Sequence, residues 1–598
     1  MYKTLKKIFY VLPAGDPIKL SVLFILMLVA AVLEVAGIGM IPAFVAIVAD
    51  PDRVLDVEWL QPLLAMLDIT DSKGLLIWGS SALVGIFIIK GAYIITFNYF
   101  EARFIFNRRY TICFRLMRSY MQAPYIFHLR RNTAELLRNI SQEINVLTNN
   151  VITTILKMGR EGVVALAILI FLFTMEPLIT LLVISLSGFG AGTFIALNKK
   201  KMKEYGEEEQ LRRMEMIKAV NQGLGGIKDA RVLNRENEFI EKFRFEAYRS
   251  TRLMAHLRFI QQIPRPVVET TAVLGMLLIA VLMVWQGRPI EAIIPILTLF
   301  AMATVRLMPS VQQLVTMYTQ LRYNIVSLDP IYNDLKELSE HNTQFVKDRD
   351  STHKLQLRKE IVINDVSYSY PGSEIEALSD ISITIPKGQA IAFVGASGAG
   401  KTTMVDLILG LLDPKQGQIL VDGTDISNNL SAWQKNIGYI PQSIYLADET
   451  LRANIAFGLP KDDIDEEKIQ NAVELAQLDT MVQGLPEGLD AEIGEHGTRL
   501  SGGQRQRVGI ARALYHEPDV LVMDEATSAL DNITEKLITE AIESLKGERT
   551  LIMIAHRLTT VKNCDKLYFM EEGKIIQEGT YEDLVDTNIR FREMALEA

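Results

Sequence analysis

Cysteine is scarce in this sequence. The 598 residues include only two cysteines, Cys113 and Cys564, which lie in separate parts of the chain. Two such residues cannot build a disulfide framework or a cysteine-based metal site. Folds held together by cross-links or by cysteine-bound zinc are therefore excluded.

The first long apolar run lacks the marks of a signal peptide. Lys3, Lys6 and Lys7 precede a run from Ile18 to Ala49, which exceeds a signal-peptide core and shows no clear small-residue cleavage site. We interpret it as a retained transmembrane helix. The chain is too long for one core, and 49% of its residues are hydrophobic. At least two domains, with embedded segments, are therefore expected. The net charge of −9 is unevenly distributed and indicates little about partners.

Several segments are apolar enough to span a bilayer, which takes about 20 mostly apolar residues. The predicted spans are residues 18–49, 74–98, 150–175, 177–198, 266–286 and 290–317. Polar stretches with helical periodicity flank the third, fourth and fifth spans, which indicates that these helices continue into water.

Lys and Arg are distributed unequally between the loops. The loop after span one contains only Arg53 and Lys73, whereas the segment between spans two and three is rich in arginine and the one after span four begins with Lys199–Lys201. Cytoplasmic loops carry the excess of Lys and Arg, so both termini are expected to be cytoplasmic. The tips of the two inward hairpins, near 124–132 and 223–232, are predicted to dock on a cytoplasmic domain rather than to remain solvated loops.

The first outer loop has a helical pattern near residues 54–67. Leucines recur at helical spacing beside Trp59, which suggests an external amphipathic helix with Trp59 at headgroup level. A partly ordered loop fits the pattern equally well.

Charged residues inside spans are costly and are functional candidates by default. They are Glu34, Lys90, Lys157, Arg160, Glu161, Arg265, Glu269 and Arg306. Basic side chains facing a cavity would bind an anionic group such as pyrophosphate, because Arg matches phosphate oxygens bidentately. Internal pairing, for instance of Glu34 with Lys90 or of Glu269 with Arg265, is the alternative for each of them.

The C-terminal part has a different character. Hydrophobicity falls after Asp329-Pro330, residues 331–356 are a polar linker, and an alternation of strands and helices follows from about residue 357. We therefore predict a transmembrane domain over 1–330 and a soluble α/β domain over 357–598.

A phosphate-binding loop is present in this α/β domain. The apolar strand 390–394 leads into Gly395-Ala396-Ser397-Gly398-Ala399-Gly400-Lys401-Thr402-Thr403 and then into a helix. This is the P-loop pattern in its required context. Lys401 is expected to reach the β- and γ-phosphates, and Thr402 to bind Mg²⁺.

Two downstream stretches fit the same chemistry. Leu521–Asp524 is an apolar strand that ends in a carboxylate suited to Mg²⁺, and Glu525 beside it is placed to polarise the attacking water. Leu500–Gln504 contains Ser501-Gly502-Gly503-Gln504, which offers backbone N–H groups and side chains to phosphate oxygens.

Together these residues closely resemble the ATP-binding cassette (ABC) transporter family over essentially the whole chain. Gly395–Thr402 is similar to Walker A, Leu500–Gln504 to the family signature and Leu521–Asp524 to Walker B. The resemblance implies a six-helix exporter-type transmembrane domain followed by an α/β P-loop nucleotide-binding domain, with coupling helices at the two hairpin tips.

The resemblance also implies the roles of individual residues. Tyr370, rather than Tyr368, would stack on adenine. The implied catalytic residues are Glu525, His556, Gln442 and Lys401, and the implied metal ligands are Thr402, Gln442 and Asp524. The nucleotide would also contact Gly395, Ser397, Gly398, Gly400, Thr403, Ser501, Gly502, Gly503, Gln504 and Asp531. The implied cofactors are ATP and Mg²⁺. The resemblance further implies a homodimer, because in this family ATP lies between Walker A of one chain and the signature of the other.

A narrower resemblance concerns the substrate. Val305–Ser310, with Tyr318 and Tyr323, and Ile263–Pro266 are similar to spans six and five of bacterial flippases for lipid-linked oligosaccharides (the PglK type). This implies ATP-driven flipping of a polyprenyl-pyrophosphate glycan to the outer leaflet of the bacterial inner membrane. Lys90, Arg265 and Arg306 are the substrate-binding candidates.

Two alternatives to this substrate stay open. A general lipid or multidrug exporter is favoured if Glu34 and Glu269 neutralise the basic residues. A non-transporting ATPase that signals through its membrane domain is the other, although the intact motif set argues against it. Membrane lipids are expected partners, and no nucleic-acid partner is expected.

Overall fold

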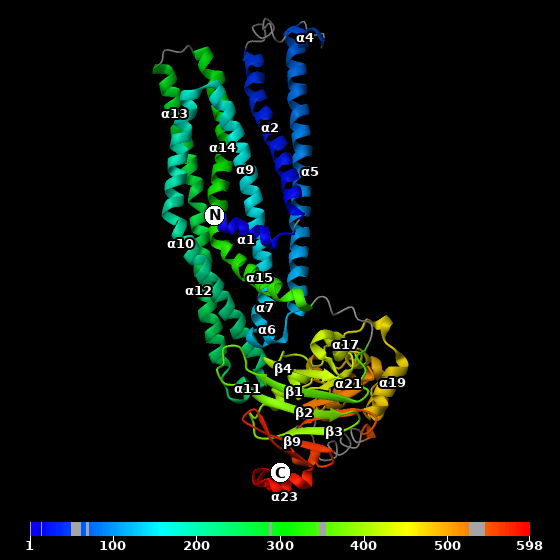
Figure 1. Cartoon of the computed structure of the whole chain (residues 1–598). Helices are drawn as coiled ribbons and strands as arrows, with labels where there is room; N and C mark the ends of the chain where they lie inside the picture. Colours follow the sequence, from blue (N-terminus) through cyan, green and yellow to red (C-terminus); the bar gives the residue numbers. More distant parts are fainter. Residues whose placement is uncertain are drawn as a thin grey trace. The chain divides into compact units, whose positions relative to one another are not determined.

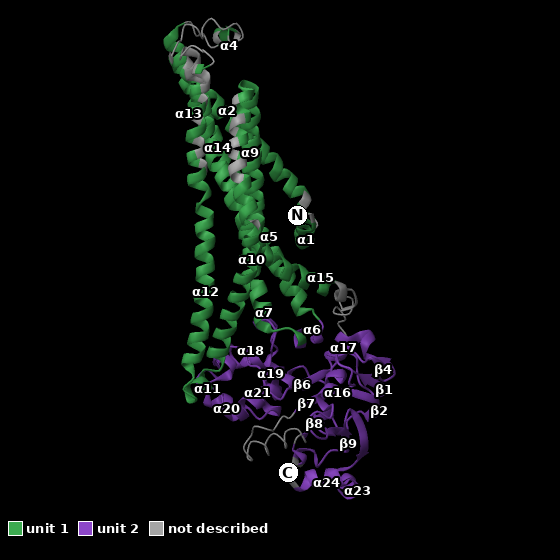
Figure 2. Cartoon of the chain, turned by 90° about the vertical axis from the view of Figure 1, so that its left-hand side faces the viewer, with its two compact units in different colours: residues 1–123, 130–340 green, residues 124–129, 341–598 purple. Residues whose placement is uncertain are grey.

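The computed structural model describes residues 2–13, 15–49, 61–66, 71–285, 290–345, 354–524, 544–555 and 557–597. The chain forms two compact units (Figure 2). One consists of residues 1–123 and 130–340, and the other of residues 124–129 and 341–598.

The described residues of the first unit are helical, and each predicted span lies in a long helix. These helices are α2 (Asp16–Ala49), α5 (Ser72–Met121), α9 (Thr153–Met175), α10 (Pro177–Gly225), α13 (Pro264–Trp285) and α14 (Ile290–Asn324). Among the described residues, two helices pass a test of length and composition for crossing a membrane, Ile18–Val45 and Ser72–Met121. In Figure 1, α2 runs beside α5, and it also packs on α9 and α14.

Shorter elements complete this unit. They are α1 (Tyr2–Val11), α4 (Gln61–Met66), α7 (Thr133–Arg138), η1 (Asn139–Glu143), α8 (Ile144–Val146), η2 (Leu147–Ile152), α11 (Ile227–Val232), α12 (Glu236–Gln262), η3 (Ile325–Ser327) and α15 (Leu328–Phe345). The segments η1 and η2 are π-helical. Such segments widen a helix locally and are frequent at functional sites.

Small and apolar side chains alternate in the core of this unit. Ala31 of α2, Ile168 of α9 and Phe300 and Ala303 of α14 are buried against one another. Small residues let membrane helices approach closely, which strengthens packing where water exclusion supplies no driving force between helices. Gly206 of α10 serves the same purpose, because a Cβ there would lie 2.1 Å from the carbonyl oxygen of Tyr323.

The first unit extends beyond residue 330, where the sequence suggested that it ends. Helix α15 continues through the first part of the predicted linker, and Ile331, Leu335 and Leu338 are buried. These apolar residues recur at helical spacing, so the segment is an amphipathic helix packed on the membrane unit rather than a free polar linker. The predicted outer helix near 54–67 lies mostly outside the described residues, and only its part Gln61–Met66 is described, as helix α4.

The second unit contains two β-sheets. An antiparallel sheet has the strand order β2-β1-β4-β5, formed by β1 (Glu360–Tyr368), β2 (Leu378–Pro386), β4 (Gln416–Val421) and β5 (Thr424–Asp425). A six-stranded sheet has the order β10-β9-β3-β8-β7-β6. Its strands are β3 (Ala390–Val394), β6 (Ile437–Ile440), β7 (Val520–Asp524), β8 (Thr550–Ile554), β9 (Lys566–Glu571) and β10 (Lys574–Gly579). All neighbours in it are parallel except β9 and β10.

The side-chain alternation of β3 explains why the strand is buried on both faces. Ile391 and Phe393 face a core shared with the antiparallel sheet, whereas Ala390, Ala392 and Val394 face a second core shared with helices. Successive strand residues point to opposite faces. An uninterrupted apolar run is therefore what a central parallel strand between two layers requires.

Helices of the second unit pack against these two cores. They are α6 (Tyr125–Arg130), α16 (Lys401–Ile408), η4 (Ile426–Asn429), α17 (Leu430–Gln434), α18 (Leu451–Ile455), η5 (Lys461–Asp463), α19 (Glu466–Leu475), α20 (Asp479–Gly484), η6 (Gly488–Asp490), η7 (Glu495–Gly497), α21 (Gly502–Tyr515), η8 (Leu558–Val561), α23 (Tyr581–Thr587) and α24 (Ile589–Glu597).

Candidate functional site

The predicted nucleotide-binding residues gather at one edge of the six-stranded sheet. The parallel strands β3, β8, β7 and β6 are neighbours, so their carboxyl ends share an edge. The P-loop follows β3, Asp524 ends β7 and Gln442 follows β6. His556 follows β8 in the sequence and lies outside the described residues. Ligands of open α/β sheets bind outside the carboxyl ends of strands, so the topology brings distant motifs to one place.

Glycine is required at two positions of the P-loop. Gly400 has φ +100°, and a Cβ there would lie 2.8 Å from the carbonyl oxygen of Ala377. Gly395 has φ +152°, and its Cβ would lie 2.2 Å from the carbonyl oxygen of Met570. The loop therefore keeps its backbone N–H groups accessible at the start of α16, where the helix dipole favours an anion.

Lys401 is held inside this loop. Its Nζ donates to the carbonyl oxygens of Gly395 at 2.8 Å and Ala396 at 3.0 Å, and the residue is buried. The neighbouring Thr402 is exposed. The loop thus presents an ammonium group and a hydroxyl, which fit phosphate oxygens and a divalent cation respectively.

Carboxylates lie close together beside the P-loop helix. Asp524 is buried at the end of β7. Burial, and then the charge of Asp524, raise the pKa of the Asp406 carboxyl of α16 to about 6. Concentrated negative charge of this kind, from hard oxygen ligands, fits a magnesium ion.

Tyr370 is placed next to the P-loop helix. Its hydroxyl lies 3.1 Å from Oγ1 of Thr403, and the ring is half-buried. Tyr368 is buried in β1, where it pairs with Leu378. Of the two, Tyr370 therefore has the accessible ring that stacking on a base requires.

The Leu500–Gln504 stretch forms the beginning of α21. Ser501 and Gln504 make a capping box, in which Gln504 N donates to Ser501 Oγ at 3.2 Å and Ser501 N donates to Gln504 Oε1 at 2.8 Å. Ser501 and Gly502 are exposed. The helix therefore presents an ordered, accessible N-terminus, which favours binding of a phosphate.

Some predicted residues cannot be placed. Glu525, Asp531 and His556 lie outside the described residues. Gln442 is described in an exposed bend after β6. The assignments of catalysis and metal binding remain predictions for all of these residues.

The candidate substrate residues divide into two groups. Lys90 and Arg306 both contact Glu34, with Nζ to Oε2 at 3.1 Å and Nε to Oε1 at 2.5 Å. Arg265 is exposed on α13 and makes no ion pair with any described residue, and Glu269 is likewise exposed. The structure thus pairs Glu34 with two of the three basic candidates and leaves the predicted alternative pair of Arg265 and Glu269 unformed.

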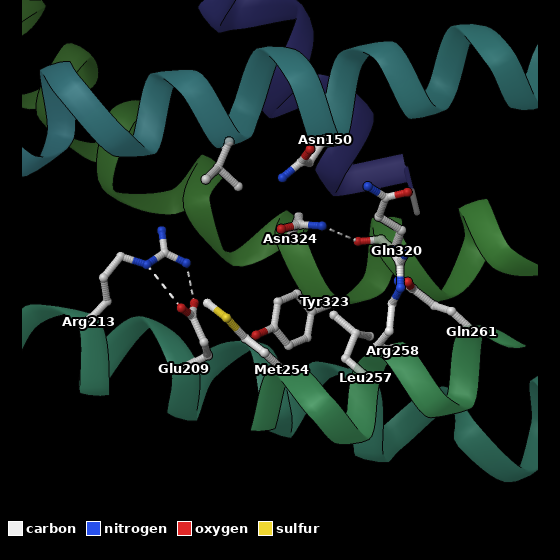
Figure 3. A pocket seen from close by; sticks show the side chains of 11 residues that line it. Asn150, Glu209, Arg213, Met254, Leu257, Arg258, Gln261, Gln320, Tyr323 and Asn324 are labelled. Atoms are coloured by element: carbon white, nitrogen blue, oxygen red, sulfur yellow. Dashed lines mark hydrogen bonds and ion pairs between the residues drawn. The ribbon is translucent and has the colours of Figure 1, made fainter. Parts of the chain in front are cut away.

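A polar cavity lies within the first unit, below the predicted start of span five. Its volume is about 310 Å³, and side chains converge on it from α10, α12, α14 and η2 (Figure 3). Arg258 and Gln261 of α12 and Asn150 of η2 line it, together with Gln320 of α14. The hydroxyl of Tyr323, which is buried, has no hydrogen-bond partner among the described residues.

Charge in the cavity is predominantly positive. Arg213 pairs with Glu209 one turn away on the same helix, α10, at the side of the cavity (Figure 3). Arg258 forms no ion pair with a described residue. Sequence reasoning missed Arg258 because it lies in the polar stretch before span five, outside the apolar window that marks intramembrane charges.

Comparisons with known proteins identify the architecture. Residues 378–528 match the family model described as ABC transporter, and residues 58–307 match the ABC transporter transmembrane region. The ATP-dependent lipid A-core flippase of Cupriavidus metallidurans is 30% identical over 471 residues, which cover 78% of each chain.

The chain belongs to the ABC transporter family. The matched membrane and nucleotide-binding regions, in this order, make it an exporter half-transporter, in which ATP hydrolysis is coupled to transport. The predicted fold class is thereby confirmed.

Further relatives extend the match to the whole chain. The ATP-dependent lipid A-core flippase of Thiobacillus denitrificans is 27% identical over 579 residues, covering 96% of this chain and 95% of that protein. A bacterial Atm1-family ABC exporter with ATP bound has a TM-score of 0.72 and 22% identity, with 96% of this chain and 98% of that chain covered. The latter supports the fold alone.

Proposed function

We propose that this ABC exporter is an ATP-driven flippase for a lipid with a phosphate-bearing, glycosylated headgroup, such as a polyprenyl-pyrophosphate glycan. It would move this lipid from the inner to the outer leaflet of the bacterial inner membrane, with both termini cytoplasmic. The relatives named as lipid A-core flippases support a lipid substrate.

The observation that carries the proposal is the polar cavity. It offers the guanidinium of Arg258 and the hydroxyl of Tyr323, which have no ion-pair or hydrogen-bond partner, respectively, among the described residues. It also offers the amides of Asn150, Gln261 and Gln320. A guanidinium suits phosphate oxygens, and amides and hydroxyls suit sugar hydroxyls. Its place near the cytoplasmic end of span five, in the predicted orientation, suits a headgroup that starts in the inner leaflet.

The runner-up is a general lipid or multidrug exporter. The observation in its favour is that Glu34 neutralises part of the charge of Lys90 and Arg306. Arg265 and Arg258, which have no described ion-pair partner, weigh against a cationic substrate.

The proposed nucleotide site requires two copies of the chain. In this proposal Lys401 and Thr402 hold the phosphates and Mg²⁺ of one ATP, and Ser501–Gln504 of the partner copy close the same site. The exposed capping box of α21 supports this, since nothing in the described structure covers it. The remaining predicted roles, namely water polarisation by Glu525 and γ-phosphate contact by His556, complete the site.

Reconstitution into liposomes tests the function. Vesicles of phospholipid would contain the protein and either a fluorescent polyprenyl-pyrophosphate glycan or the matched polyprenol glycan without phosphate. We expect ATP-dependent flipping of the first lipid and little of the second. Equal flipping of both lipids would favour the general exporter, and Glu525→Gln vesicles control for leakage and passive movement.

A further inference from the structure

Four membrane helices meet at a network of charged side chains centred on Glu34. Glu34 of α2 is 6% exposed, and its two oxygens contact Lys90 of α5 and Arg306 of α14, at 3.1 and 2.5 Å. Arg306 also contacts Ser310 at 2.9 Å and Glu161 of α9 at 3.5 Å. A single carboxylate therefore forms ion pairs with two cations that come from different helices.

The two cations are more accessible than the carboxylate between them. The side chains of Lys90 and Arg306 are 16% and 27% exposed, whereas that of Glu34 is 8% exposed. The Nη2 of Arg306 makes no described hydrogen bond, because Nε faces Glu34 and Nη1 faces Ser310 and Glu161. Arg306 thus keeps one nitrogen that makes no described hydrogen bond, and both cations are partly exposed, so an anion could compete with Glu34 for them.

A second carboxylate provides a contrast within the same helices. Glu101 of α5 is also buried, and it pairs with Arg160 of α9 at 3.2 Å. It contacts neither Lys90 nor Arg306 directly in the described structure. Its partner Arg160 also lies 3.4 Å from Glu161, so Glu101 is linked to Arg306 only through these two intervening side chains. Glu101 therefore has the same chemistry and a similar burial as Glu34, but it does not neutralise the candidate substrate-binding cations.

We propose that Glu34 is an internal counter-ion that competes with an anionic headgroup for Lys90 and Arg306, and so sets how tightly the transporter holds that headgroup. This rests on the proposed function. Without Glu34, Lys90 would lose its described ion-pair partner and Arg306 would keep only Glu161, at 3.5 Å. The two cations would then bind a diphosphate more strongly, because opposite charges attract strongly where water is scarce. Transport requires release as well as binding, and a carboxylate that returns to both cations assists release. One carboxylate oxygen of Glu34 contacts each cation, which supports a role as a shared counter-ion rather than as the partner of one cation.

Binding to purified dimers in nanodiscs tests the inference. The probes are farnesyl diphosphate and farnesol, which share a tail and differ in charge. The variants are Glu34→Gln and, as the matched control, Glu101→Gln. We expect Glu34→Gln to bind farnesyl diphosphate about tenfold or more tightly than wild type, equivalent to about 1.4 kcal/mol. Farnesol affinity should be unchanged, and Glu101→Gln should change diphosphate affinity much less than Glu34→Gln, because Glu101 contacts neither cation directly.

The outcomes separate the two proposals. If wild type binds farnesyl diphosphate tightly and Glu34→Gln binds it equally or more weakly, Glu34 only holds the two cations in place. That result would overturn the counter-ion inference but leave the proposed function standing. If wild type binds farnesyl diphosphate no more tightly than farnesol, the proposal that the substrate is anionic is contradicted. If Glu34→Gln does not fold, Glu34→Asp is decisive: its shorter side chain keeps the charge but cannot reach both cations, so binding should tighten by a smaller factor than tenfold.

Discussion

A buried carboxylate on α15 ties the cytoplasmic ends of the membrane helices together. Asp334 is 2% exposed and accepts hydrogen bonds on Oδ2 from Tyr120 at 2.5 Å and from Asn139 at 2.9 Å. Arg131 lies 3.4 Å from its Oδ1. These partners come from the end of α5, the start of η1 and the segment beside α6. Asp334 thus holds the base of the first inward hairpin to α15.

The Asp334→Asn variant should loosen this hairpin. The substitution keeps one acceptor but removes the charge from two hydrogen bonds and one ion pair. Hydrogen bonds to charged groups are worth about 1.5–3 kcal/mol, against about 0.5–1.5 kcal/mol for neutral ones. The local opening free energy should therefore fall by about 2–4 kcal/mol, which speeds amide exchange by about 30- to 1,000-fold.

Glu337 provides the matched control for this variant. It lies on the same helix and contacts the same Arg131 at 3.0 Å, but its side chain is 44% exposed. Exposed ion pairs are worth about 0–1 kcal/mol, so Glu337→Gln should change exchange by less than about fivefold. Hydrogen exchange of the full chain, followed over residues 116–121, 133–145 and 331–338, measures both. If the two variants change the exchange rates equally, or if Asp334→Asn changes none of them, burial does not make the contacts of Asp334 stronger than those of Glu337.

Four further predictions concern the sites. Glu525→Gln should bind ATP but lose hydrolysis by about 100-fold or more, and near-normal turnover would remove Glu525 from its role. Lys401→Ala should weaken nucleotide binding, and an unchanged dissociation constant would contradict the P-loop assignment. Arg306→Ala should impair flipping of a pyrophosphate-linked lipid more than basal ATPase activity, whereas an equal loss of both would make Arg306 structural. Asp406→Asn should raise the urea midpoint of unfolding, measured without Mg²⁺, at pH 7.5 but not at pH 4. The raised pKa of Asp406 means that the wild-type protein loses stability as pH rises from about 4 to about 6, and the variant does not carry this loss. The same difference at both pH values would contradict it.

The sequence was most informative where one backbone geometry is required. The P-loop glycines must adopt positive φ and admit close backbone approach, so their spacing alone indicates the loop, and the structure has these conformations at Gly395 and Gly400. The apolar runs of β3 and β7 predict central parallel strands for the same reason, since both faces are covered.

The sequence was least informative where partners come from distant helices. Glu34 and Arg306 are 272 positions apart, and no periodicity joins them. The polar cavity escaped notice because its residues are ordinary polar residues of helices that extend beyond the membrane. The continuation of α15 past residue 330 depends on buried residues such as Ile331 and Leu335, whose spacing is hidden among charges.

The two predicted docking tips belong to different compact units and differ in how their apolar side chains are covered. The tip with α6 belongs to the second unit, and its Ile126 packs on the core shared by the two sheets. The tip with α11 belongs to the first unit and leaves Leu224, Val232 and Leu233 exposed, at 68%, 73% and 66%. Clustered apolar side chains at a helical tip suit a protein interface rather than water. The exposed apolar side chains of this tip therefore agree with the sequence-based prediction that it docks on a nucleotide-binding domain.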